Sequence, residues 1–169
     1  MLFGVKHKGF TLIELLIGVS IVAILITVGI PSFISVMQQN RVDNLSMMLV
    51  KDLRTTRSQS ISLRQPVTAC FVNNADTCVQ NNGVRMLIFV DDNGNGVFNN
   101  TEHLIKQGED LSSSIIVTNS ETRYVFRSDG LLNGNSGTIT LCSNRSDITG
   151  QQISVLASGL VQSQDKNDC

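Results

Sequence analysis

The first part of the chain is dominated by one long apolar stretch. From Leu15 to Asn40 no residue carries a charge. In a helix these 26 residues would span roughly 39 Å, which exceeds a bilayer core of about 30 Å. Pro31 lies inside the stretch, and its missing N–H should kink or locally loosen the helix. The pattern therefore predicts a membrane-spanning helix with a kink near Pro31.

After Asn40 the pattern becomes amphipathic. Leu45, Leu49 and Leu53 recur every four residues, while charged residues occupy the other faces. We expect this second part of the helix to pack its leucines on a sheet and to end near Gln65-Pro66.

The remainder of the chain has the pattern of β-structure. Short apolar or alternating runs are separated by clusters of Gly, Asn, Asp and Ser, and they predict strands at Val67–Val72, Val84–Val90, Ser114–Val117, Arg123–Phe126, Gly137–Cys142 and Gln152–Leu156. The predicted fold is α+β, a long N-terminal helix packed on an antiparallel β-sheet.

A short basic leader precedes the apolar stretch in the segment Lys6-His7-Lys8-Gly9-Phe10-Thr11-Leu12-Ile13-Glu14. A secretory signal peptide would place its small-residue cleavage site after the apolar region, whereas Gly9 lies in front of it. This arrangement resembles the class III signal of type IV prepilins and pseudopilins. The resemblance implies that prepilin peptidase cuts after Gly9 and N-methylates Phe10, and that the apolar helix remains in the mature protein.

A single carboxylate, Glu14, stands at the start of the apolar helix. Ionisable residues in membrane helices are costly and usually have a partner and a role. In pilins the matching glutamate is thought to meet the N-terminal amine of a neighbouring subunit, so the resemblance implies an assembly role for Glu14. The alternative is a carboxylate that reaches the membrane interface and takes no part in assembly.

The same resemblance divides the chain into three parts. Residues 1–9 are the leader, 10–37 the transmembrane and assembly helix, and 38–169 a periplasmic pilin head. Loss of Lys6 and Lys8 with the leader changes the formal charge from −1 to −3. These basic residues also favour a cytoplasmic N-terminus. We therefore expect a single-pass protein of the inner membrane that later enters a pilus or pseudopilus.

Four cysteines suit an oxidising compartment. They lack CxxC spacing and have only His7 and His103 to assist them, which argues against a zinc site. The four cysteines are most simply explained as two disulfides, for which three connectivities are possible. Proximity along the chain favours Cys70–Cys78, which leaves Cys142–Cys169; a Cys70–Cys142 bond would reject this pairing.

Further motifs resemble the GspH/FimT family of minor pilins and type II secretion pseudopilins over nearly the whole chain. They are the helix-to-strand junction from Arg57 to Cys70, the hairpin from Gly83 to Gly96 with Glu102 beyond it, the segments Phe126–Gly130 and Thr138–Cys142, and the stretch from Ile153 to Gly159. The resemblance implies partners among other minor and major pilins or pseudopilins, besides prepilin peptidase and inner-membrane lipid.

One departure from the family concerns DNA. FimT-like proteins implicated in DNA uptake carry Gly-Arg-x-Arg after the final glycine, whereas this chain has Gly159-Leu160-Val161-Gln162. Binding to DNA requires a positive patch that neutralises phosphates, and this tail does not supply one. Six arginines elsewhere could still cluster after folding: Arg54, Arg57, Arg64, Arg85, Arg123 and Arg127. The sequence thus argues against DNA as a partner.

One loop fits the calcium pattern D-x-[DN]-x-[DN]-G-x5-E at each specified position, with Asp91, Asn93, Asn95, Gly96 and Glu102. Calcium prefers clustered oxygens, and the glycine permits a sharp turn. However, the flanks are predicted strands, where an EF-hand needs helices. The alternative is a β-turn rich in Asn and Gly, so we expect no cofactor and retain calcium as a hypothesis.

No pattern of an active site is present. The sequence has neither a nucleophile elbow nor a metal-binding histidine motif, so we expect no enzyme. The functional prediction is a minor pilin of a Gram-negative type IV pilus, a structural or priming subunit for twitching, adhesion or DNA uptake. One alternative is a GspH-like pseudopilin of type II secretion, and another is a FimT-like DNA-binding pilin.

Overall fold

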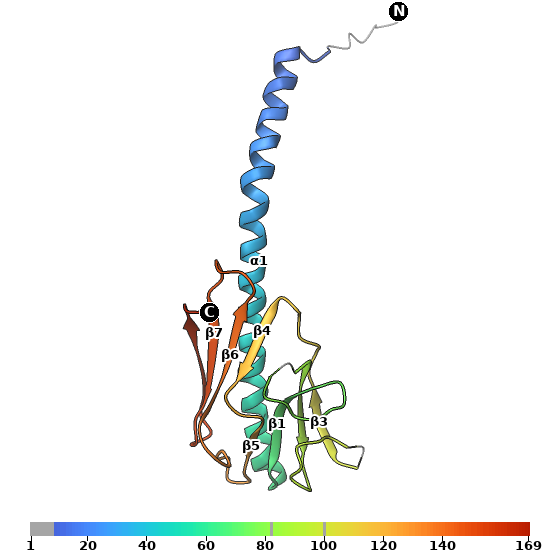
Figure 1. Ribbon diagram of the computed structural model, residues 1–169, viewed down its shortest axis with the longest axis vertical. Helices are drawn as coiled ribbons and strands as arrows, with labels where there is room; N and C mark the ends of the chain where they lie inside the picture. The colour runs from blue at the N-terminus through green and yellow to red at the C-terminus, as the bar shows by residue number, and fades with distance from the viewer. Residues whose placement is uncertain (1–8, 82, 100) are drawn as a thin grey trace, which may run out of the picture. The chain divides into compact units, whose positions relative to one another are not determined.

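The computed structural model describes residues 9–81, 83–99 and 101–169. These residues form one helix and eight strands (Figure 1). The elements are α1 (Leu12–Leu63), β1 (Val67–Val72), β2 (Arg85–Val90), β3 (His103–Gln107), β4 (Ile115–Asn119), β5 (Tyr124–Phe126), β6 (Gly137–Ser143), β7 (Gly150–Val155) and β8 (Val161–Lys166). The chain divides into two compact units, and the boundary in the sequence falls after Met37.

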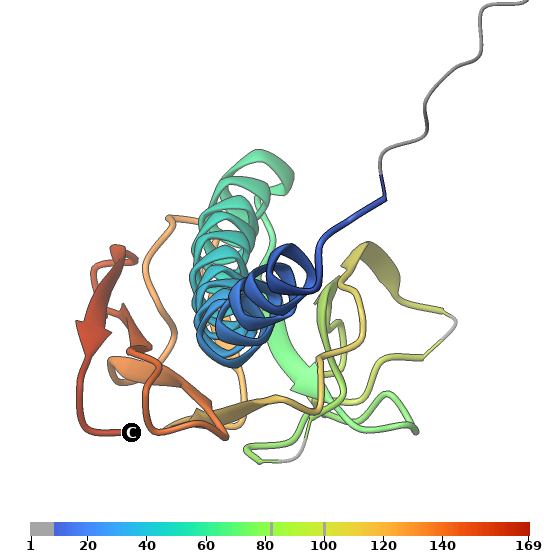
Figure 2. The same cartoon turned by 90° about the horizontal axis from the view of Figure 1, so that it is seen from above.

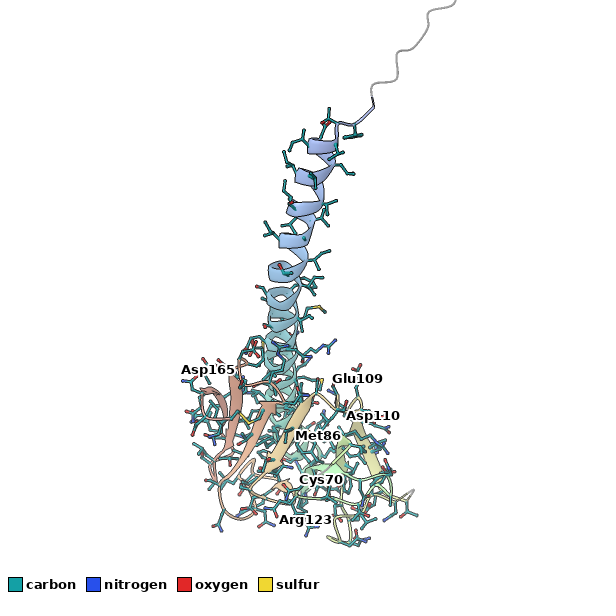
Figure 3. The ribbon with its side chains drawn as sticks, turned by 45° about the horizontal axis from the view of Figure 1, so that its top comes forward. Cys70, Met86, Glu109, Asp110, Arg123 and Asp165 are labelled. Carbon is teal, nitrogen blue, oxygen red and sulfur yellow. A yellow bond between two sulfur atoms is a disulfide. The ribbon has the colours of Figure 1, made fainter. Side chains whose placement is uncertain are left out.

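The first unit contains the N-terminal part of α1. Its apolar side chains project from the ribbon (Figure 3) and are exposed, from Phe10 at 84 % to Met37 at 43 %. Among the described residues, α1 is the helix that is long and apolar enough to cross a membrane, and its most apolar stretch is unburied. Within its described residues, the unit therefore has a helical backbone and no buried apolar side chain.

The second unit contains the rest of α1, and this part of the helix buries one face. Val42, Leu49 and Leu53 are fully buried and share one hydrophobic core with residues of both sheets. The predicted leucine stripe is therefore present, although Leu45 is only partly buried at its edge. The helix ends at Leu63, where Arg64 turns to a positive φ of 56°, a conformation that commonly terminates helices.

The strands form two four-stranded antiparallel sheets, with orders β3-β2-β1-β5 and β4-β6-β7-β8. Viewed from above, they lie along the C-terminal part of α1, with β1 in green and β8 in red on different flanks of the helix (Figure 2). In β6 the side chains alternate between buried and half-buried, which is the period of a sheet with one face on the core. The predicted α+β class is confirmed.

Two strands were missing from the sequence prediction. β3 and β8 each lie at one edge of a sheet, and most of the β8 side chains are exposed. An outer strand with little apolar burial lacks the alternation by which strands are recognised. Backbone pairing with β2 and β7 places them in the sheets instead.

Candidate functional site

Glu14 lies in the first turn of α1 and is exposed. Thr11 caps this turn, because its Oγ1 accepts a hydrogen bond from the Glu14 N–H at 3.3 Å and its carbonyl accepts one from the Leu15 N–H at 3.2 Å. The carboxylate is thus held near the positive end of the helix dipole. It remains available to a partner outside the chain.

A shallow apolar groove lies beside this carboxylate. Its lining consists of Phe10, Glu14, Leu15, Gly18, Val19 and Val22. A Cβ added at Gly18 would meet no atom within 4 Å, so the face is open at this glycine. Small residues allow close approach between apolar helices, and the groove brings such a face together with Glu14.

The processing site is only partly described. Gly9 and Phe10 are exposed, whereas the preceding Lys6, His7 and Lys8 lie outside the described residues. Cleavage and methylation therefore remain predictions. The backbone of α1 is helical through Pro31, and the kink predicted there also remains a prediction.

Both disulfides are present in the pairing that sequence proximity favoured. Cys70 of β1 is joined to Cys78 across 8 positions, and Cys142 of β6 to Cys169 across 27. The second bond fixes the end of the chain against β6. The described residues contain no free cysteine, so the cysteines act here as covalent links within the head.

The loop with the calcium pattern connects β2 to β3. Asp91 accepts backbone hydrogen bonds from Asn95 and Gly96, at 3.0 and 2.9 Å. Glu102 accepts one from Asn99 at 3.1 Å. Val90 pairs with His103, so the register brings Asp91 and Glu102 to the same end of the strand pair.

Several of the candidate arginines are paired with acidic side chains. Arg85, Arg123 and Arg127 each form an ion pair, with Asp76, Asp91 and Asp129 respectively. Arg123, labelled in Figure 3, lies just before β5. Half of the arginines named as DNA candidates are thus neutralised locally.

Arg54 and Arg57 have a role that the sequence did not reveal. They donate hydrogen bonds from α1 to the carbonyls of Val161 and Gly159, at 2.9 and 3.1 Å. Gly159 lies in the turn between β7 and β8, and Val161 is the first residue of β8, so the two guanidinium groups attach that turn to the helix. The spacing of three residues places both arginines on one helix face, but only the fold identifies their acceptors.

Polar residues at the start of the head make a second connection. Gln39 donates to the Thr149 carbonyl at 3.1 Å and accepts from the Thr149 N–H at 3.0 Å. Asp43 accepts from Gln39 and from Gln151 of β7. The helix surface is therefore tied to the sheet by side chains that the amphipathic pattern assigns to solvent.

No catalytic cluster was found in the part of the chain that the structure describes. Within those residues, no three side chains of His, Cys, Asp or Glu gather to hold a metal. His103 is exposed at the start of the outer strand β3. The side chains described above form hydrogen bonds with backbone groups and ion pairs with oppositely charged side chains.

Comparison with known proteins gave two family matches. Residues 47–159 match the family of the type II transport protein GspH, and residues 5–30 match the prokaryotic N-terminal methylation motif. Among curated protein sequences, none matches the chain.

Solved structures with a similar fold include pilus and secretion subunits. The type IV minor pilin FimU of Pseudomonas aeruginosa is 15 % identical, with a TM-score of 0.60 over 75 % of this chain and 90 % of its own. The minor pseudopilin EpsH of the Vibrio cholerae type 2 secretion system is 9 % identical, with a TM-score of 0.53 over 73 % and 96 %. At these identities the likeness establishes the fold.

The family match covers most of the head, and the methylation motif adjoins an exposed apolar helix. Both features are those of a membrane-anchored pilin or pseudopilin, a class of structural subunits that assemble with one another. The chain therefore belongs to the GspH family of minor pilins and pseudopilins.

Proposed function

We propose that this protein is a minor pilin of a type IV pilus, a structural or priming subunit. The observation that carries the proposal is the unburied apolar helix with Glu14 in its capped first turn, preceded by the methylation motif. Such a helix needs an apolar environment. The bilayer provides one before assembly, and a bundle of like helices provides one in the filament.

In this proposal the N-terminus is prepared before assembly. Prepilin peptidase cuts after Gly9 and the new amine of Phe10 is methylated, while the apolar helix holds the subunit in the inner membrane. Residues 38–169 then lie on the periplasmic side, where disulfides form. The two disulfides of the head support that placement.

Assembly then depends on Glu14. Lipid chains are as apolar as leucine, so helix association in a membrane relies on close packing and on polar contacts. The groove at Gly18 provides a close-packing face, and Glu14 provides a charge for the amine of an adjacent subunit. A salt bridge of this kind strengthens as water is excluded.

The family match to GspH is shared by pilus subunits and pseudopilins. The stretch Ile30-Pro31-Ser32-Phe33 looks more like pilus subunits than like secretion pseudopilins, and it is the reason for proposing a pilus. The DNA-binding alternative is weaker, because exposed Leu160 and Gln162 stand where arginines would be needed.

The decisive experiment combines gene deletion with complementation. The deletion strain receives the wild-type gene, Glu14→Ala, or Glu109→Ala as a matched control at an exposed carboxylate of the head. We expect the deletion and Glu14→Ala to abolish surface pili, with the membrane level of the Glu14→Ala subunit equal to that of the wild type. Glu109→Ala should restore pili.

Secreted proteins and DNA uptake are measured in the same cultures. Normal pili with failed secretion would replace the proposal by the pseudopilin alternative. Normal pili and secretion with failed DNA uptake would favour the DNA-binding pilin. Normal assembly with Glu14→Ala would reject the role of the carboxylate.

A further inference from the structure

The loop between β2 and β3 is the motif that filament assembly leaves unexplained. It comprises twelve positions, Asp91 to Glu102, of which the structure describes all but one. Pairing of Val90 with His103 brings the two ends of the loop together. The loop therefore begins and ends with a carboxylate at the same place in the head.

The first half of the loop folds around its own oxygen atoms. Asn93 and Asn95 accept backbone hydrogen bonds from Asn95 and Val97, at 2.9 and 2.7 Å. Gly94 and Gly96 have φ values of +69° and +71°, which residues with a side chain rarely adopt. Only 4 % of the Asp91 side chain is exposed. The chain thus folds around the side-chain oxygens of Asp91, Asn93 and Asn95.

Glu102 supplies an independent observation at the other end. The residue is 8 % exposed, and its Oε2 accepts the Asn99 N–H at 3.1 Å. Its Oε1 is buried without a hydrogen-bond partner among the described residues. The Glu102 carboxylate is thus bonded to the loop backbone through Oε2, while Oε1 has no hydrogen-bond donor among the described residues. A buried carboxylate oxygen without a hydrogen-bond donor is costly, and a bound cation would offset that cost.

Backbone geometry adds another oxygen. Val97 faces Thr77 in an isolated antiparallel bridge. The hydrogen bonds of that bridge use the flanking groups, from Cys78 N–H to Gly96 O at 2.8 Å and from Phe98 N–H to Asp76 O at 3.0 Å. In such a pair the residue's own N–H and C=O point away from the partner strand. The Val97 carbonyl is therefore directed to the same side as its N–H, which contacts Asn95 in the loop.

We infer that the loop from Asp91 to Glu102 binds calcium. The ligands are the side-chain oxygens of Asp91, Asn93, Asn95 and Glu102 and the Val97 carbonyl. An oxygen-only set with two carboxylates suits calcium rather than zinc. The inference concerns the head alone and does not depend on which filament the protein joins.

Arg123 determines how strong this site is. Its Nη1 lies 3.3 Å from Asp91 Oδ2, and a Cβ at Gly96 would lie 2.7 Å from the same nitrogen. The guanidinium therefore covers the start of the loop and repels a second cation. With two carboxylates and this competitor, the dissociation constant falls in the weak range of extracellular calcium modules, about 10⁻⁴ to 10⁻³ M.

The test uses the full chain in detergent micelles after treatment with a chelator. Calorimetric titration with calcium chloride should give saturable heat, and the midpoint of thermal unfolding should rise with calcium but not with magnesium at matched ionic strength. Glu102→Gln should weaken binding at least about tenfold. Glu109→Gln, a matched change at an exposed glutamate beyond the other end of β3, should leave it unchanged.

Arg123→Gln sharpens the test, because loss of the competing charge should tighten calcium binding several-fold. If Glu102→Gln fails to fold, as judged by circular dichroism, Asn93→Ala and Asn95→Ala replace it at exposed positions and should each weaken binding. Absence of heat and of any thermal shift at about 10 mM calcium would overturn the inference. Binding that is equal in the wild type and in the ligand variants would overturn it as well.

Discussion

The two parts of α1 place the same residue types in opposite surroundings. Leu16 and Ile17 in the first unit are 55 % and 54 % exposed, whereas Leu49 and Leu53 in the second are fully buried. All four residues lie in the same continuous helix, from Leu12 to Leu63. Backbone structure is therefore the same, and only the surroundings of the side chains differ.

This difference teaches where each part obtains its stability. The second part of the helix belongs to the hydrophobic core of the head, whose members lie between Val42 and Val161. The first part leaves a continuous apolar surface exposed, far more than a soluble protein usually tolerates. We infer that lipid or other helices cover it in the cell, as the proposed function requires.

The largest expected effect separates the two parts directly. Leu53→Ala should destabilise the head by about 3–5 kcal/mol, because it leaves a cavity in a packed core. Leu16→Ala should change head stability by less than about 0.5 kcal/mol. Tyr124 is the protein's one tyrosine, and tryptophan is absent. Urea unfolding in detergent, followed by its fluorescence, therefore reports on the head.

Equal destabilisation by the two leucine variants would contradict this distinction between the two parts of α1. It would mean that the exposed part of α1 also supports the head. A matched control is Leu15→Ala, at another exposed leucine of the first unit.

The disulfides should contribute next, and only to the head. In the chain-entropy model, closure across 27 positions stabilises by about 3.5 kcal/mol and closure across 8 by about 2.5 kcal/mol. Replacing Cys142 and Cys169 by serine should therefore lower the free energy of unfolding more than replacing Cys70 and Cys78. The same urea unfolding measures both double variants. A larger loss from the shorter loop would show that local packing outweighs loop length.

The smallest of these effects is a pH dependence of the head. Burial is the main cause that raises the pKa of Tyr124 from 10.0 to about 12, with a further increase from the charge of Glu121 against a lowering by Ser120. The folded state thus holds the phenolic proton more tightly than the unfolded state. The resulting stability is complete below pH 10 and is lost as the pH rises towards 12, by about 2 kcal/mol.

Absorbance titration of the single tyrosine measures this pKa in the folded protein. Tyr124→Phe removes the titrating group, along with a hydrogen bond to the Thr138 carbonyl at 3.0 Å. Stability measured at several alkaline pH values should therefore fall less steeply in this variant. The same slope in both proteins would contradict the assignment to Tyr124.

The sequence predicted most of the fold where the strands bury apolar side chains, whether continuously as in β1 or alternately as in β6. β1 was predicted with its observed bounds, and β2, β4, β5, β6 and β7 within two residues at each end. The outer strands β3 and β8 were missed, since their side chains are largely exposed. The split into two sheets was also missed, because strand periodicity does not reveal which strands pair.

The candidate sites were predictable to a similar extent. The spacing of Asp91 and Glu102 was visible in the sequence, but the buried and unpartnered oxygen of Glu102 was not. Likewise Gly130 and Gly159 belong to separate motifs, and only the fold brings them together. A Cβ at Gly159 would lie 2.1 Å from the Gly130 carbonyl. Contacts over such distances along the chain depend on the complete sheet arrangement.

The sequence by itself determined the local features of this protein. The uncharged stretch specified an apolar helix, the leucine period specified its packed part, and the basic leader with Gly9 and Glu14 indicated the family. These signals act over one or a few helical turns, so they can be read along the chain. Tertiary structure decided which carbonyls accept hydrogen bonds from Arg54 and Arg57, and which carboxylates lie buried in the loop after β2. The physical reason is that burial and partner choice depend on segments up to about a hundred residues apart in the sequence.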